Sequence, residues 1–333
     1  MLEVLTNGAL NIVVDSGRHG FMGIGVSRAG PMDALALDIA NALVGNGPEA
    51  AAIEVSIFPF RIAFLADMVI AVTGAPCRAE LGRHRMPPYW AMRARAGDIL
   101  SLHPPELGAR AYLATAGGLA VSPVLGSRST EVKASFGGLQ GRALRRGDRL
   151  DVDLEEADGQ TFPHGAAGFG VLTETLAAYW RELQTGTVQL RVLPAAEYDE
   201  FTDRARRDFA KASYQVSEES NRTGARLRGD PLALRYRREL LSHGIVPGTI
   251  QVPPSGEPIV QLAEANTCGG YPKIATVIER DLWKCGQMRP RTRLTFRPID
   301  LEEAIEALKD GAAELQDLKN TVRGQSCRTP TPS

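Results

Sequence analysis

The sequence lacks the features of a membrane, secreted or nucleic-acid-binding protein. No apolar run approaches the ~20 residues that a bilayer span requires. The first fifteen residues have no cationic start followed by an apolar core, which a signal peptide would need. Because 38 basic and 39 acidic residues leave a formal net charge of −1, no long-range field attracts polyanions. We expect a cytoplasmic protein with no membrane and no nucleic-acid partner.

Metal and disulfide frameworks also lack support. The four cysteines, Cys77, Cys268, Cys285 and Cys327, are far apart and form no C-x-x-C pair. The five histidines are never at the spacing of metal ligands. We therefore expect reduced thiols and no metal site.

The usual catalytic signatures are missing as well. The chain has no G-x-x-x-x-G-K-[ST] phosphate loop, no G-x-S-x-G elbow and no H-E-x-x-H pair. These absences argue against an ATPase, a hydrolase or a metalloprotease that acts alone.

What the sequence does contain is many short apolar stretches between turn residues. The 34 glycines and 21 prolines are scattered between stretches such as 61–72, 110–114 and 249–252. Most gaps between them are too short for a crossover helix, so a parallel sheet is disfavoured. The pattern predicts a mainly β, mostly antiparallel fold.

Three helices are expected beside the strands. The first covers 33–44 and ends at Gly45-Asn46-Gly47, and the second covers 171–183 with Leu172, Leu176 and Trp180 as its buried stripe. The third begins at an Asp300 cap with Glu303 three residues on. Its expected apolar face consists of Leu301, Ile305, Leu308, Ala312 and Leu315.

An internal repeat organises the chain. Shifting by 197 residues aligns 53–67 with 250–264 without a gap and with five identities, and Asp67 then meets Glu264. At a shift of 194, 28–30 meets 222–224 and 95–102 meets 289–296. We expect two similar β-barrels at 1–160 and 185–300, a linker helix within 161–184, a C-terminal helix at 301–320 and a disordered tail at 321–333.

Three glycine-flanked polar clusters could carry chemistry. G-S-R-S-T at 126–130 suits a carboxylate or phosphate, although composition alone favours a hydrogen-bonded structural turn. G-V-S-R-A-G-P-M-D at 25–33 could bind a ligand or form a helix cap and an ion pair. E-A-N-T-C-G-G-Y-P-K at 264–273 is the richest, because a carboxylate, an amide, a hydroxyl, a phenol and an amine surround a Gly-Gly bend. Its simpler interpretation is a β-bulge with an exposed lysine.

These clusters, together with R-A-Y-L-A-T-A-G-G-L, S-N-R-T-G-A-R-L-R-G and G-T-I-Q-V-P-P-S-G-E-P-I-V, resemble the biotin-dependent carboxyltransferase family. That family includes the C subunit of 5-oxoprolinase, the second subunit of allophanate hydrolase and the carboxyltransferase region of urea carboxylase. The resemblance runs from about 15 to 298. It implies two tandem cyclophilin-like β-barrel domains with a few helices, which agrees with the repeat.

The resemblance implies a subunit that is active only in a complex. The first expectation is an ATP-dependent 5-oxoprolinase that opens 5-oxoproline to glutamate, with a smaller companion subunit of the same family and a third subunit. An alternative is a carboxyltransferase subunit that uses carboxybiotin on a partner to carboxylate urea, guanidine or an amide. A second alternative is a regulatory protein that antagonises a kinase inhibitor. In each case the substrate or ligand is small, and no cofactor is bound covalently.

The resemblance also places the site residues. The implied catalytic residues are Lys273 as a charge clamp, Glu264 as an acceptor for a substrate N–H, and Tyr271. The implied substrate-binding residues, among which Arg128 anchors an anion, are Arg28, Asp33, Ser127, Arg128, Ser129, Arg222, Asn266 and Thr267. Glu264 and Asn266 depart from the family's usual D-x-Q, and Pro290-Arg291-Thr292 replaces its P-G-D turn.

Overall fold

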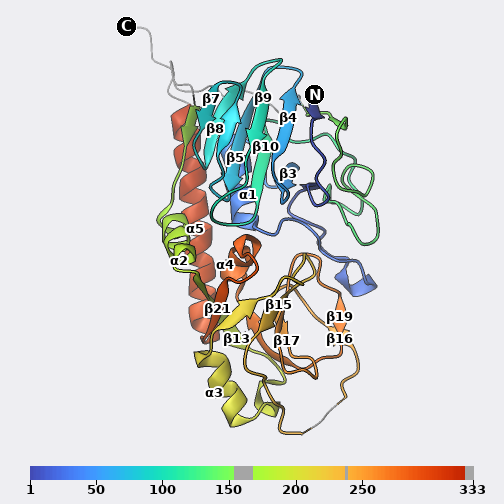
Figure 1. Cartoon of the computed structure of the whole chain (residues 1–333), viewed down its shortest axis with the longest axis vertical. Coiled ribbons are helices and arrows are strands. Elements are labelled where there is room, and N and C mark those ends of the chain that lie inside the picture. Colours follow the sequence, from blue (N-terminus) through green and yellow to red (C-terminus); the bar gives the residue numbers. More distant parts are fainter. Residues whose placement is uncertain (154–167, 237–238, 327–333) are drawn as a thin grey trace. The chain divides into compact units, whose positions relative to one another are not determined.

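A computed structural model describes residues 1–153, 168–236 and 239–326. Within these ranges the chain forms two compact units (Figure 1). Unit 1 contains residues 1–18, 33–153, 168–173 and 312–326, and unit 2 contains 19–32, 174–236 and 239–311. Residues 19–32, which the sequence analysis places in the first barrel, lie in unit 2.

Unit 1 is built on two six-stranded antiparallel sheets. The first has the order β11 (Arg149–Leu150), β1 (Leu2–Val4), β4 (Phe60–Phe64), β9 (Ile99–Leu102), β6 (Ala79–Leu81) and β7 (His84–Met86). The second has the order β12 (Gly168–Gly170), β8 (Trp90–Ala94), β5 (Met68–Gly74), β10 (Ala111–Thr115), β3 (Ala52–Val55) and β2 (Ile12–Val14).

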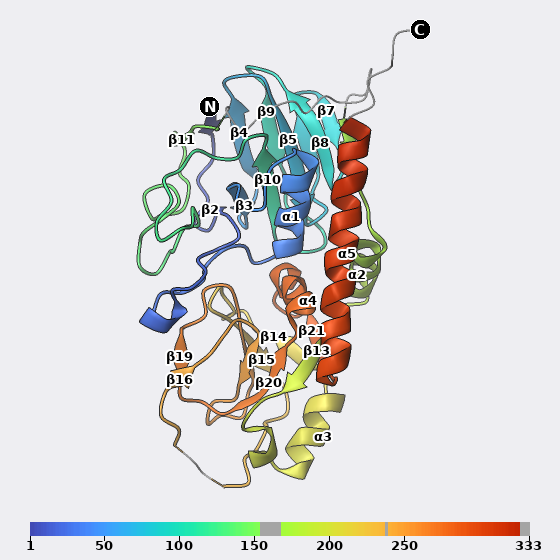
Figure 2. The same ribbon diagram turned by 180° about the vertical axis from the view of Figure 1, so that it is seen from behind.

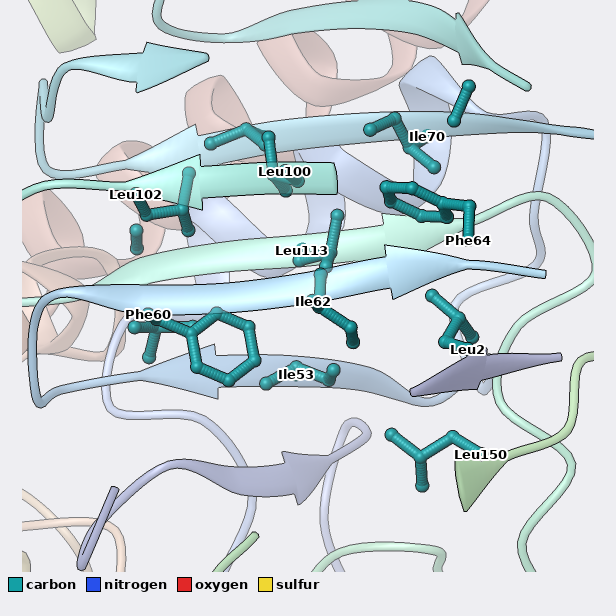
Figure 3. Packing of buried hydrophobic residues seen from close by; sticks show 14 of the residues in the cluster. Leu2, Ile53, Phe60, Ile62, Phe64, Ile70, Leu100, Leu102, Leu113 and Leu150 are labelled. Atoms are coloured by element: carbon teal, nitrogen blue, oxygen red, sulfur yellow. The ribbon is translucent and has the colours of Figure 1, made fainter. Parts of the chain in front are cut away.

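The core of unit 1 follows from alternation along these strands. In β4 the residues Phe60, Ile62 and Phe64 are buried, whereas Arg61 between them is exposed, as the period of two in a strand requires. They pack with residues of the other sheet such as Ile53 and Leu113 (Figure 3). This apolar packing supplies the main stabilisation of unit 1.

Helix α1 (Ala34–Leu43) contacts β5 and β10 (Figure 2). Asp33 caps it, because its Oδ1 accepts from the backbone N–H of Ala36 at 2.9 Å. The expected helix at 33–44 and its cap are therefore confirmed.

Unit 2 is built on a closed barrel. Its strands follow the order β13 (Thr187–Pro194), β20 (Lys273–Val277), β17 (Thr249–Gln251), β18 (Ile259–Gln261), β15 (Gly224–Arg228), β14 (Tyr214–Val216) and β21 (Arg293–Pro298). A two-stranded ribbon of β16 (His243–Gly244) and β19 (Cys268–Gly269) accompanies it. Among the described strand pairs, β13 with β21 is the one parallel pair, so the mainly β, mostly antiparallel fold is confirmed.

Short helices complete unit 2. The α-helices are α2 (Glu174–Gln184), α3 (Asp203–Lys211) and α4 (Glu279–Leu282), and the 3₁₀ helices are η1 (Met22–Ile24), η2 (Tyr198–Glu200) and η3 (Trp283–Gln287). The buried stripe expected for the second helix is wrong in part. Leu176 is buried as expected, but Leu172 precedes the helix and is exposed, and Trp180 is half-buried. Tyr179 and Leu183 complete the buried stripe.

The C-terminal helix α5 runs over Leu301–Ser326, beyond the expected end at 320, and residues 327–333 of the expected tail lie outside the described residues. The Asp300 cap is confirmed by a 2.9 Å bond from the Glu303 N–H. The expected apolar face is wrong, since Leu301, Ile305 and Leu308 are exposed. The helix instead buries the side chains of Ala307, Leu318 and Val322.

The repeated blocks fall on matching strands. Blocks 53–67 and 250–264 contain β4 and β18 and the ends of β3 and β17, and blocks 95–102 and 289–296 lead into β9 and β21. The turns before β9 and β21 are closed alike. The Arg95 N–H donates to Asp98 Oδ2 at 2.9 Å, and the Arg289 N–H donates to Thr292 Oγ1 at 3.2 Å.

Candidate functional site

The residues expected to form the site are divided between the units. Unit 1 contains Asp33, Ser127, Arg128 and Ser129, whereas unit 2 contains Arg28, Arg222, Glu264, Asn266, Thr267, Tyr271 and Lys273. Each group has its own local geometry.

Arg222 and Glu264 form a buried ion pair in unit 2. Arg222 precedes β15 and Glu264 follows β18, and the Glu264 N–H donates to the Arg222 carbonyl at 2.9 Å. Arg222 Nε donates to Glu264 Oε1 at 2.6 Å, and its Nη2 donates to the carbonyl of Gly30 at 2.6 Å. Both side chains are about 95% buried (5% and 4% exposed). The pair therefore fastens the loop at Gly30 to the barrel, and Glu264 is engaged within the chain.

A row of buried polar side chains crosses the neighbouring strands. Gln261 on β18 donates from Nε2 to Gln251 Oε1 on β17 at 3.0 Å. Gln251 in turn lies opposite Lys273, the first residue of β20. All three residues are buried. Because a buried polar group without a partner is costly, the hydrogen bond between the two glutamines stabilises this row within the barrel.

Lys273 is surrounded by two further titratable groups. Its backbone N–H donates to Glu197 Oε2 at 3.1 Å, and its Nζ lies 3.9 Å from the same oxygen. Nζ also contacts Nε2 of His243, and that nitrogen lies 3.5 Å from Glu197 Oε1. Burial lowers the pKa of Lys273, and the charge of Glu197 opposes this shift. The interpretation of an exposed lysine is therefore wrong, although the register of β17 with β20 does shift between Ile250 and Gln251, opposite Lys273.

The two glycines of the 264–273 segment allow close backbone packing. A Cβ on Gly269 would lie 2.5 Å from Gln251 Nε2, and a Cβ on Gly270 would lie 2.9 Å from the Leu240 carbonyl. The Leu240 carbonyl is a backbone group that cannot easily move, so glycine is required at position 270, whereas a Cβ at position 269 would need only the end of the Gln251 side chain to shift. The two glycines, of which Gly269 belongs to strand β19, thus allow the 240–243 segment and Gln251 to lie against the end of the motif.

The rest of the segment is open to solvent. Asn266 and Cys268 are exposed, Thr267 is half-buried, and Tyr271 is 46% exposed. Arg28 is half-buried and lies 3.6 Å from Glu279 Oε1. These side chains present an amide, a hydroxyl, a thiol, a phenol and a guanidinium in the same unit as the buried polar row, and such groups suit the recognition of a small polar molecule.

In unit 1 the G-S-R-S-T segment surrounds a buried carboxylate that sequence reasoning missed. The hydroxyls of Ser127 and Ser129 each donate to Asp15 Oδ1 at 2.6 Å, and the Arg128 N–H donates to Asp15 Oδ2. Ser127, Ser129 and Asp15 are all buried. The two hydroxyls therefore serve this internal network, whereas Arg128 is half-buried and its Nε donates to the Val121 carbonyl at 3.1 Å.

Asp33 likewise belongs to a buried structural network in unit 1. Besides capping α1, its backbone N–H donates to Tyr112 Oη at 2.8 Å. Tyr112 donates onward to Glu54 Oε2 at 2.7 Å, and Arg110 Nε lies 3.7 Å from Glu54 Oε1. Burial, together with the charge of Glu54, raises the pKa of Tyr112 well above its usual value, so its hydroxyl remains a donor.

A separate surface cavity lies among α2, α4 and η3 of unit 2. Its volume is about 320 Å³, and its walls include the Arg191–Asp281 pair at 2.7 Å. None of the site residues expected from the sequence lines it. In the described ranges no cluster of three or more His, Cys, Asp and Glu side chains could hold a metal ion. None of the described helices is both long and apolar enough to cross a membrane.

Sequence reasoning missed four residues around Lys273, namely Glu197, His243, Gln251 and Gln261. The two glutamines carried a usable signal, because each interrupts an apolar strand, in T-I-Q-V and in I-V-Q-L. Glu197 and His243 lie 76 and 30 residues from Lys273. Since they follow no short-range pattern, only the fold brings them together.

Comparison with known proteins agrees with this architecture. The chain is 42% identical to the C subunit of 5-oxoprolinase from Escherichia coli (strain K12), over 93% of this chain and 95% of that protein. It is 31% identical to urea amidolyase of Lachancea kluyveri, over 96% of this chain but 18% of that protein. The crystal structure of the K. lactis urea amidolyase matches 95% of this chain and 20% of that chain, with a TM-score of 0.84 and 27% identity.

A family model described as carboxyltransferase domain, subdomain A and B, matches residues 24–298. This range includes the barrel of unit 2, most strands of the unit 1 sheets and every site residue expected from the sequence. The chain therefore belongs to the carboxyltransferase domain family with subdomains A and B.

Proposed function

We propose that this chain is a subunit of a multi-component, ATP-dependent enzyme that hydrolyses 5-oxoproline to glutamate. The observation that carries the proposal is the 42% identity to the C subunit of 5-oxoprolinase, which covers 93% of this chain and 95% of that protein. A shared fold alone would not fix the function. The match covers that relative nearly end to end, which favours the oxoprolinase role.

Lys273 is the residue best placed to assist amide chemistry. Hydrolysis of a lactam moves negative charge onto the carbonyl oxygen as water adds to its carbon. A cation in a largely buried site stabilises that charge more than one in water, because the local dielectric constant is lower. The burial of Lys273 beside Gln251 supports its role as the charge clamp.

The solvent-exposed side chains of the same segment are proposed to contact the substrate. Tyr271, Asn266 and Thr267 offer hydrogen bonds to the ring amide, and Arg28 offers a cation for the substrate carboxylate. Glu264 remains a proposed acceptor for the substrate N–H. Its ion pair with Arg222 supports a second task, which is to fix the start of the segment.

The unit 1 residues receive narrower roles. Arg128 remains the proposed anion anchor, because its guanidinium is half-buried and not confined to the Asp15 network. Binding through Ser127 or Ser129 would require their hydroxyls to leave Asp15, and binding through Asp33 would compete with its helix cap. The contacts that these three residues make favour scaffolding roles.

The proposed enzyme needs other components. ATP would be used by the complex, no cofactor would be attached covalently to this chain, and a smaller companion subunit of the same family together with a third subunit would complete the assembly. The Escherichia coli relative is itself one subunit of its enzyme, which supports an assembly of several different chains. A cytoplasmic location remains a prediction.

A carboxyltransferase role is the second candidate. It is favoured by the match to urea amidolyase of Lachancea kluyveri, of which this chain covers 18%. In that case the polar segment would hold urea or a related amide while carboxybiotin on a partner supplied the carboxyl group.

Reconstitution distinguishes these roles. The chain would be co-purified with its companion subunits and supplied with 5-oxoproline and ATP, with release of glutamate and ADP as the readout. We expect glutamate only when ATP and this chain are both present. Carboxylation of urea that requires bicarbonate and a biotinylated carrier would instead establish the second role. Binding of the companion subunit with neither activity would support a regulatory protein.

A further inference from the structure

His243 lies beside the buried amine of Lys273. Its ring contacts the amine of Lys273 in the polar segment described above. We propose that His243 is a proton-relay residue that acts through Lys273: the Lys273 ammonium gives its proton to the leaving ring nitrogen as the C–N bond breaks, and His243 returns a proton from solvent to the amine. This inference deepens the proposed function and rests on it for the catalytic consequence. The coupling between the two side chains is a property of the isolated chain.

The backbone fixes the tautomer of the ring. His243 Nδ1 lies 3.0 Å from the carbonyl oxygen of Leu241. A carbonyl oxygen can only accept, so Nδ1 must carry the hydrogen. In the neutral ring the lone pair is then on Nε2, which is the nitrogen that contacts Lys273 Nζ. Neutral His243 is therefore oriented to accept a proton from the lysine.

The protonated ring has a partner as well. When Nε2 carries a hydrogen, Glu197 Oε1 lies 3.5 Å away to balance the new charge. Glu197 Oε2 is held by the Lys273 backbone N–H at 3.1 Å and lies 3.9 Å from Nζ. One carboxylate thus faces both bases, so the positive charge can reside on either base without losing its counter-ion.

The exposed fractions of the three side chains show which of them can exchange protons with water. The side chains of Lys273 and Glu197 are 10% and 11% exposed, whereas that of His243 is 43% exposed. Of the three groups, the imidazole is therefore the one with ready access to water. Burial lowers the pKa of Lys273, which lets the ammonium give up its proton during turnover and regain one from the neighbouring imidazole.

The glycine pair Gly269-Gly270 supports the position of His243. Strand β16 carries His243 and pairs with β19, so that His243 lies opposite Gly269. A Cβ on Gly270 would displace the Leu240 carbonyl, which lies next to the Leu241 carbonyl that fixes the ring. The glycines of the 264–273 segment therefore position the histidine as well as the lysine.

The coupling can be tested in the isolated chain by NMR. With ¹³C-labelled histidine, the pH titration of His243 is followed in wild type, Lys273→Met and Glu197→Gln. Removing the ammonium should raise the titration midpoint of His243 by about one pH unit or more, and removing the carboxylate charge should lower it. Lys309→Met, which removes an exposed lysine on α5, should leave it unchanged. An unchanged midpoint in Lys273→Met overturns the proposal.

The relay itself is tested in the reconstituted complex. His243→Ala should lower kcat by about 10²-fold, the scale of a lost proton transfer, with little change in KM. Added imidazole should restore part of kcat, and the pH at which kcat is half-maximal should move. His243→Gln, which keeps a hydrogen-bonding side chain, should fold as wild type does but stay slow. An active complex in which both variants keep the wild-type kcat and pH profile overturns the relay alone, whereas an inactive wild-type complex counts against the proposed function and leaves the NMR result standing.

Discussion

Each unit has a polar side chain that lies opposite another polar residue on the neighbouring strand, but the two side chains have different hydrogen-bond partners. In unit 1 Tyr112 on β10 lies opposite Glu54 on β3 and donates to it at 2.7 Å. In unit 2 Lys273 on β20 lies opposite Gln251 on β17, but its amine contacts His243 and faces Glu197. In the first pair, the Tyr112 hydroxyl donates a hydrogen bond to the Glu54 carboxylate, so each residue is the other's partner. In the second, the amine faces two groups that can exchange protons with it.

The ends of the repeated block show the same contrast. Asp67 ends the block in unit 1 and accepts from the Ala96 N–H at an exposed turn. Glu264 ends it in unit 2 and forms a buried pair with Arg222. The carboxylate that ends the block thus closes an exposed turn in unit 1, whereas the longer Glu264 forms a buried ion pair in unit 2. Specialisation of the second copy is visible in side-chain partners, while the strands themselves correspond.

The largest difference between the units should appear when these carboxylates are neutralised. Glu264→Gln leaves the buried Arg222 charge without its counter-ion and should cost about 3–5 kcal/mol of folding free energy. The matched change Asp67→Asn keeps an acceptor at an exposed site and should cost less than about 0.5 kcal/mol. Urea denaturation of both variants measures this. Equal, small losses would show that Glu264 is not an internal anchor.

A smaller loss of folding free energy is expected when the hydrogen bond between Tyr112 and Glu54 is removed. Tyr112→Phe removes the donor to Glu54 and the acceptor for the Asp33 N–H, which should cost about 1–3 kcal/mol. Its matched control, Tyr271→Phe, alters an exposed phenol and should be nearly neutral in stability. Because the folded-state pKa of Tyr112 is raised, its contribution is present below the ordinary tyrosine pKa of about 10 and is lost as the pH rises above it. Wild type should therefore lose its advantage over Tyr112→Phe at alkaline pH, and a constant difference would contradict this account.

The smallest effect concerns the matching turns before β9 and β21. Gly97 has φ of +93° and Arg291 has φ of +76° at the corresponding position, a region that glycine adopts without strain. Arg291→Gly should therefore stabilise the chain by about 0.5–1 kcal/mol, and Gly97→Ala should destabilise it by a similar amount. Thermal melts of the pair report both signs, and destabilisation by Arg291→Gly would mean that its side chain matters more than its backbone.

Local signals predicted much of the fold. Turn residues and short apolar stretches predicted antiparallel strands, and the Asp33 and Asp300 caps located two helix starts. The exposed face of α5 shows the limit of periodicity. Leu301, Ile305 and Leu308 recur at helical spacing as a buried face would, but Ala307 on the other side fits the space available. Which apolar face is covered depends on the shape of the neighbouring surface, which spacing does not encode.

The site was predictable only in part, for a related reason. Lys273 and Glu264 stood out because one short segment gathers their chemistry. Asp15, Glu197 and His243 did not, because each joins its cluster through contacts across 30 or more residues. The serines of G-S-R-S-T looked available for an anion in sequence. In the structure both hydroxyls donate hydrogen bonds to Asp15.

The central claim is that the buried amine of Lys273 in the barrel of unit 2 carries the chemistry of the complex. It is tested most directly by the rate of ATP-dependent glutamate release from 5-oxoproline by complexes that contain wild type, Lys273→Met or Lys309→Met. We expect Lys273→Met to assemble normally and to lose at least about 10²-fold in kcat, as removal of an oxyanion donor does, while Lys309→Met matches wild type. A Lys273→Met complex that turns over at the wild-type rate would contradict the account.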